Sequence, residues 1–87
     1  MKAQIKLDEG QFTLNILGEF VEVVKSSNDE TVCSASRMNM HFVDKDEKII
    51  LIHMLTAIVM RLVRNGYLNA AKDVRLIIRG MELGFNF

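Results

Sequence analysis

The sequence has 87 residues, of which 49% are hydrophobic and 25% charged, with equal numbers of acidic and basic residues. This length indicates one domain, the hydrophobic content excludes a disordered chain, and the balanced charge excludes a strongly basic nucleic-acid coat protein. The charge is unevenly distributed, because residues 1–47 carry nine acidic and five basic side chains, whereas residues 48–87 carry two acidic and six basic ones. The two halves are therefore electrostatically complementary.

Cysteine content and hydropathy indicate the environment of the protein. Cys33 is the single cysteine, which excludes a disulfide within the chain and a zinc site made of several cysteines. The N-terminal residues lack the uninterrupted apolar segment of a signal peptide, and the apolar run 49–60 is shorter than the ~20 residues that span a bilayer. We therefore expect a soluble, cytoplasmic protein that does not insert into membranes.

The first residues of the chain show the alternation of apolar and polar side chains that is typical of strands. Segments 2–7 and 11–17 both alternate in this way. The short connection between them ends in Gly10, which suits a turn that needs a positive φ at that position. The two segments are therefore predicted to pair as a hairpin.

Two further strands are predicted in the first half of the chain. Segment 19–25 fits helical spacing, but its three valines favour a strand. A longer strand is predicted over 32–43, because Met38, Met40 and Phe42 alternate with polar residues there and would share a buried face.

The second half of the chain has the features of two helices. Asp44 followed by Glu47 resembles a capping box and predicts a helix over about 45–64. Gly66 is suited to the left-handed conformation that ends a helix. A second helix is predicted over about 67–80 from the spacing of its apolar residues.

These elements together predict a single α+β domain over residues 1–87. An antiparallel meander of three to four strands would be followed by a C-terminal antiparallel helical hairpin, and the two parts would form a two-layer sandwich. The order of the elements, strands first and helices last, is the basis of this prediction.

The first predicted helix is unusually apolar for a helix on the surface of a small domain. Between residues 49 and 63 its only clearly polar side chains are His53, Thr56 and Arg61. If one face covers the sheet and another meets the second helix, some apolar residues have no assigned cover, and we expect them to form a homodimer interface. The expected interface residues are Ile50, Met54 and Ile58. The alternative is a monomer in which the meander and the C-terminal Phe85 and Phe87 cover the helix.

The sequence offers few groups for catalysis. His41 and His53 have no motif spacing, and the chain contains no nucleotide-binding loop, nucleophile elbow or zinc-protease motif. His53 is interpreted as a core or interface histidine, and Cys33 as a buried thiol. The acidic residues near residue 46 are better explained as helix capping than as a cation site. We therefore expect no catalytic residues, no metal site and no cofactor.

The helical half contains a group of basic side chains that could bind a partner. The five candidates are Arg61, Arg64, Lys72, Arg75 and Arg79. The last three recur at helical spacing, so they share one face of the second helix. They could bind phosphates or an acidic protein surface, or simply form a solvated face. The internal methionines are interpreted as core residues, although they could also form an adaptable binding surface; they are Met38, Met40, Met54, Met60 and Met81.

The resulting functional hypothesis is a small non-enzymatic binding protein that acts as an adaptor, inhibitor or regulator of another macromolecule. It would act as a homodimer with a protein partner, in the manner of a prokaryotic or viral accessory protein. The alternative is a nucleic-acid-binding protein that uses the basic face of the helical hairpin. Nucleic acid ranks second because single-strand binding usually needs aromatic side chains for stacking, and Tyr67 is the only one near this face.

Overall fold

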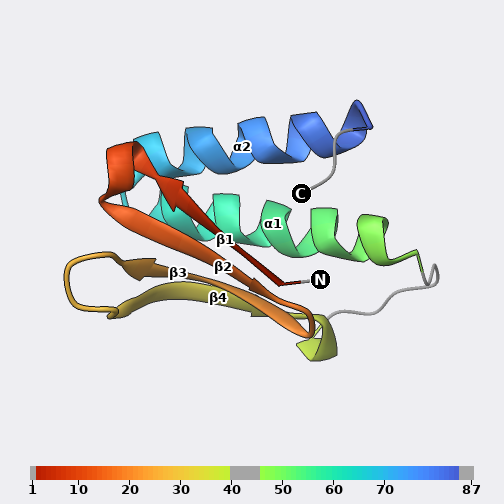
Figure 1. Ribbon diagram of the computed structural model, residues 1–87, viewed down its shortest axis with the longest axis horizontal. Helices are drawn as coiled ribbons and strands as arrows, with labels where there is room; N and C mark the ends of the chain where they lie inside the picture. Colours follow the sequence, from red (N-terminus) through yellow and green to blue (C-terminus); the bar gives the residue numbers. More distant parts are fainter. Residues whose placement is uncertain (1, 40–45, 85–87) are drawn as a thin grey trace.

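The computed structural model describes residues 2–39 and 46–84, and shows a four-stranded antiparallel sheet followed by two helices (Figure 1). The predicted α+β class and the predicted order of the elements are confirmed. The elements are β1 (Lys2–Leu7), β2 (Phe12–Leu17), β3 (Phe20–Lys25), β4 (Thr31–Ser36), α1 (Glu47–Arg64) and α2 (Leu68–Glu82).

The sheet is a simple meander with the strand order β1-β2-β3-β4, and every neighbouring pair is antiparallel. Segment 19–25, whose spacing also fitted a helix, is the strand β3. Val21 and Val23 are fully buried on the inner side of β3. Pairing with two neighbouring strands and burial of these valines favour a strand over the helix that the spacing of apolar residues also fitted. The β1–β2 hairpin closes on the pair Leu7 and Phe12, with Gly10 at a φ of 92° in the turn.

The two helices run side by side in opposite directions on one face of the sheet, as Figure 1 shows. α1 packs on β3 and β4, and α2 packs beside α1 and reaches β1 and its turn. The core lies between the layers, where Leu14 of β2 belongs to one cluster of buried residues with Leu55 and Leu62 of α1. Ala70 and Ala71 are also buried there, so small residues lie where the helices approach each other.

The predicted long strand over 32–43 is wrong in its length and in its buried face. β4 ends at Ser36, and a single 3₁₀ turn, Arg37–Asn39, follows it. Met38 is 87% exposed, whereas Met40 and Phe42 lie outside the described residues. The buried side chains of β4 are instead Cys33 and Ala35.

The pairing of β4 with β3 explains this difference. Val23 pairs with Cys33 and Val21 pairs with Ala35. Directly opposed residues of antiparallel strands lie on the same face of a sheet, so β3 determines which side of β4 faces the helices. The alternation that predicted the opposite face comes from residues beyond the end of the strand.

The ends of α1 follow from local hydrogen bonds. Asp46 caps its start, because the Asp46 side chain accepts hydrogen bonds from the backbone N–H groups of Lys48 and Ile49 at 2.9 and 3.4 Å. The predicted cap, Asp44, lies outside the described residues. At the other end Gly66 has a φ of 84°, and the backbone N–H of Tyr67 donates to the carbonyl oxygen of Leu62 at 2.9 Å. The predicted glycine stop is therefore confirmed.

Candidate functional site

The three residues predicted to form a dimer interface lie in the core of the monomer. The exposed fractions of Ile50, Met54 and Ile58 are 2%, 2% and 0%. A four-stranded sheet on one side and α2 on the other suffice to cover them, so the prediction that these side chains are uncovered is wrong. Any contact between copies must use other residues.

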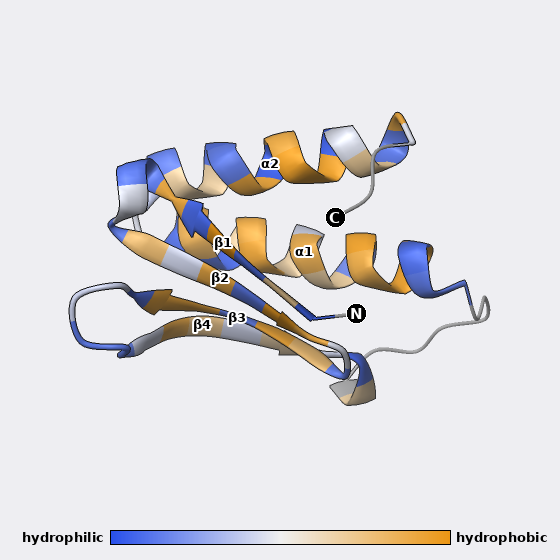
Figure 2. Ribbon diagram, viewed as in Figure 1, coloured by the Kyte–Doolittle hydropathy of each residue, from blue (hydrophilic) through white to orange (hydrophobic). Residues whose placement is uncertain are grey.

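The apolar side chains that α1 leaves exposed lie on the side turned away from the sheet. Ile49, Met60 and Val63 are 37%, 59% and 40% exposed. Ile49, Thr56 and Val63 are spaced by two helical turns, so they form a line along α1, and Met60 lies beside this line. Figure 2 shows α1 coloured as hydrophobic over most of its length, whereas hydrophilic and hydrophobic segments alternate along α2.

α2 is clearly amphipathic and contributes charge to the same side of the molecule. Its buried side chains include Ala70, Ala71 and Val74, which face the core. Lys72, Arg75 and Arg79 are exposed. They recur at spacings of three and four residues, so they form a row on the opposite side of α2.

A shallow hollow of about 380 Å³ connects the two helices. It is lined by Val59, Met60, Val63 and Arg64 of α1 and by Arg75 of α2. An apolar strip of α1 therefore lies next to the cationic row of α2. We call this surface the outer face and define it by Thr56, Met60, Val63, Arg64, Lys72, Arg75 and Arg79.

One of the five predicted basic residues does not belong to the outer face. Arg61 follows Met60 directly, and one residue of an α-helix corresponds to a rotation of about 100°. Arg61 consequently lies on the β4 side of α1, near Cys33. Burial raises the pKa of the Cys33 thiol, and the positive charge of Arg61 offsets part of this effect. The other four basic residues are exposed on the outer face.

The residues considered for catalysis are not brought together. His41 lies outside the described residues, and His53 is exposed on α1 and not part of the core. Cys33 is buried beneath α1. Among residues 2–39 and 46–84, no group of three His, Cys, Asp or Glu side chains could hold a metal ion.

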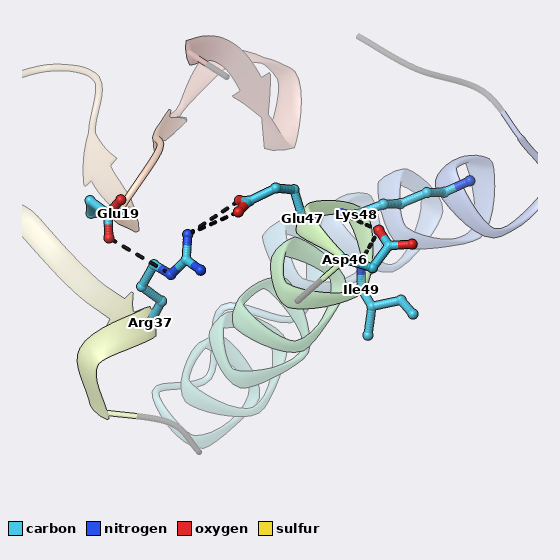
Figure 3. A network of polar contacts seen from close by, with 6 residues as sticks. All are labelled: Glu19, Arg37, Asp46, Glu47, Lys48 and Ile49. Atoms are coloured by element: carbon cyan, nitrogen blue, oxygen red, sulfur yellow. Dashed lines mark hydrogen bonds and ion pairs between the residues drawn. The ribbon is translucent and has the colours of Figure 1, made fainter. Parts of the chain in front are cut away.

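Polar contacts at two places, which the sequence did not predict, connect the sheet to the helices. Arg37 lies 3.7 Å from the Glu19 carboxylate, and its guanidinium donates to both carboxylate oxygens of Glu47 at 3.2 Å (Figure 3). The backbone N–H of Asp8 donates to the Asp73 carboxylate at 2.7 Å. The first contact joins the β2–β3 turn to the start of α1, and the second joins the β1–β2 turn to α2.

A second hollow of about 640 Å³ lies at one end of the sheet. Its lining includes Phe12, Lys25, Ser26 and Tyr67. The rings of Phe12 and Tyr67 pack at a centroid distance of 4.9 Å. Lys25 lies 3.9 Å from the Glu30 carboxylate, so its charge is already partly balanced. This hollow is open and has a mixed polar and apolar lining, and it does not bring together reactive groups.

No protein-family model matches the sequence, and comparisons with curated proteins and with solved structures gave no match. None of the described helices is long and apolar enough to cross a membrane. The outer face is therefore the candidate functional site on the grounds of its own geometry and chemistry.

Proposed function

We propose that this protein is a small non-enzymatic binding protein that recognises another protein through the outer face. The observation that supports the proposal is the exposure of apolar side chains beside a row of cations on a domain whose core is already complete. Met60 is 59% exposed, although nineteen other hydrophobic residues form one buried cluster. Apolar patches rimmed by polar groups are typical of interaction sites.

The composition of the outer face favours a protein partner over nucleic acid. Methionine and arginine are enriched at protein interfaces. Phosphate groups would pair with Arg75 and Arg79 but would gain nothing from the apolar strip of Met60 and Val63. The outer face also has no aromatic side chain on which a base could stack.

A cytoplasmic location is part of the proposal and is supported by the lone, buried thiol of Cys33.

The outer face is an unfavourable site for self-association. A twofold pairing brings the same patch of both copies together. Arg64, Lys72, Arg75 and Arg79 would then face their own equivalents, and like charges at an interface are destabilising. The proposed partner is therefore a different protein. The homodimer expected from the sequence stays a prediction about some other part of the surface.

Capture from cells of the native host with two matched baits tests the proposal. Wild-type protein and the double variant Met60→Asp/Arg75→Glu are immobilised, and captured proteins are identified by mass spectrometry. We expect a defined protein to be retained by the wild type and by Arg61→Glu, which reverses one positive charge outside the outer face as Arg75→Glu does within it. Far-UV circular dichroism confirms that both variants fold.

Two results would contradict the proposal. In the first, every captured protein is retained equally by the wild type and the double variant. In the second, the material that depends on the outer face is nucleic acid whose capture weakens steeply with salt, as counterion release requires. The second result would support the alternative of nucleic-acid binding.

A further inference from the structure

We infer that the occupant of the outer face is an acidic amphipathic helix of the partner protein. Its apolar side would pack on Met60 and Val63, and its carboxylates would face Lys72, Arg75 and Arg79. The inference rests on the proposed function and specifies the chemistry of the segment that binds there.

The charge of the outer face calls for an acidic segment. Its four basic residues are exposed, and the two acidic residues of α2 offset at most one of these four charges. Asp73 is turned toward the β1–β2 turn, where it accepts the hydrogen bond from Asp8 at 2.7 Å. Glu82, the last residue of α2, follows Arg79 by three residues, so it lies at the end of the same row and offsets one of the four positive charges. Arginine pairs with carboxylates through two parallel hydrogen bonds, which gives such contacts both strength and direction.

The backbone of α1 and α2 favours a helical partner segment over an extended one. Both surrounding elements are helices, whose backbone groups are bonded within each helix. An extended segment would therefore lie on this surface with no backbone donors or acceptors to pair with, and unpaired buried backbone groups are costly. A helix satisfies its own backbone and can lay an apolar side into a groove between two helices.

The line of exposed side chains on α1, which extends beyond the outer face to Ile49, sets the length of this helix. Ile49 and Val63 are fourteen residues apart on α1, which corresponds to about 21 Å at the rise of an α-helix. A partner helix of about four turns would follow the whole strip. Its apolar residues would recur every three or four positions, with acidic residues on the side that faces α2.

A designed peptide tests the inference directly. The probe is a capped peptide of about 18 residues with leucine at helical spacing, glutamate along one flank and a single tryptophan. The protein contains no tryptophan, so tryptophan fluorescence reports on the peptide alone. One control peptide replaces every glutamate with lysine, and another has the same composition with leucines alternating at strand spacing.

We expect saturable binding of the glutamate peptide, with an increase in peptide helicity measured by circular dichroism. The protein variant Arg75→Glu/Arg79→Glu should weaken binding about tenfold, because two attractive contacts become repulsive, whereas Arg61→Glu should change it by less than about twofold. Added salt should also weaken binding.

Specific outcomes would overturn the inference. These are no binding of the glutamate peptide, equal binding of the lysine or strand-spaced peptide, and equal binding by Arg75→Glu/Arg79→Glu. If host proteins are nevertheless captured through the outer face, only the acidic helix is refuted and the proposed function stands. If capture also shows no dependence on the outer face, both are refuted.

Discussion

Truncation of Ile58 to alanine distinguishes a residue of the monomer core from a residue of a dimer interface. Ile58 is 0% exposed and lies in the middle of α1, between the sheet and α2. Replacing a buried isoleucine by alanine removes its burial energy and leaves a cavity, and typically costs about 2–5 kcal/mol. The side chain has no exposed part that could reduce this cost, so we expect a loss of about 3 kcal/mol in the free energy of unfolding.

Urea unfolding followed by far-UV circular dichroism measures this loss. For a domain of this size the denaturant slope is about 1 kcal/mol per molar urea, so the midpoint should fall by about 3 M. The total free energy of unfolding expected for 87 residues is roughly 4 to 13 kcal/mol, so the variant should still fold at low temperature unless the protein lies at the bottom of this range. Met60→Ala is the matched control, because Met60 lies on the same helix but is 59% exposed. It should cost less than about 0.5 kcal/mol.

The dependence on protein concentration separates the two interpretations. A core residue of a monomer gives the same midpoint at all concentrations, whereas unfolding coupled to dissociation gives a midpoint that rises with concentration. A loss below about 1 kcal/mol for Ile58→Ala would refute the burial of this side chain. A loss of the expected size, with midpoints of both proteins that rise with concentration, would show that unfolding is coupled to dissociation, as burial of Ile58 between copies requires.

The remaining predictions concern the contacts that join the layers, the lone thiol and the oligomeric state. Arg37→Ala removes the ion pairs with Glu19 and Glu47. Since the two carboxylates are largely exposed, unfolding in urea should show a loss of only about 1 kcal/mol that shrinks in high salt, and an equal loss at all salt concentrations would contradict an ionic origin. Asp73→Ala leaves the backbone N–H of the β1–β2 turn without its acceptor and should cost about 1–3 kcal/mol by the same assay, whereas a cost near zero would mean that water replaces the carboxylate. Burial raises the pKa of Cys33 in the folded protein above the ordinary thiol value of 9.0. The folded state therefore favours the neutral thiol, and the contribution of Cys33 to the free energy of unfolding should be constant below pH 9.0 and fall as the pH rises from 9.0 toward the folded pKa. Cys33→Ala should remove this pH dependence, and an identical pH profile for both proteins would show that another group causes it. Light scattering on a sizing column tests the homodimer, and a single species of 9.9 kDa at high micromolar concentration would exclude it.

The oligomeric state bears on how the outer face would be used. If the homodimer forms through another surface, two outer faces would be presented together, and a partner with two acidic helices would bind with increased avidity. A monomer would present one outer face and could block one segment of its partner. The scattering and capture experiments together distinguish these arrangements.

Local sequence features determined where most of the elements begin and end. The alternation in residues 2–7 predicts β1, and the positions of Gly10 and Gly66 predict the first hairpin turn and the end of α1. These signals depend on the conformation of a few neighbouring residues, such as a positive φ that glycine adopts at low cost. For that reason they can be recognised without the rest of the chain.

The tertiary structure decided which faces are buried. The inner side of β4 depends on its pairing with β3, so Cys33 and Ala35 are buried although the residues that follow β4 suggested the opposite face. Ile58 is covered because a whole sheet and α2 meet around α1. The sequence showed that α1 is too apolar for an ordinary surface helix, but it could not show which apolar residues the other layers would cover.

The outer face depends both on local sequence and on tertiary packing. The spacing of Lys72, Arg75 and Arg79 was sufficient to predict that they share one side of a helix, because that spacing is a property of α-helices alone. That Met60 and Val63 lie beside them, and that Arg61 does not, follows from how α1 and α2 are rotated against each other when they pack on the sheet. Local conformation is specified by neighbouring residues, whereas the composition of a surface depends on contacts between residues far apart in the chain.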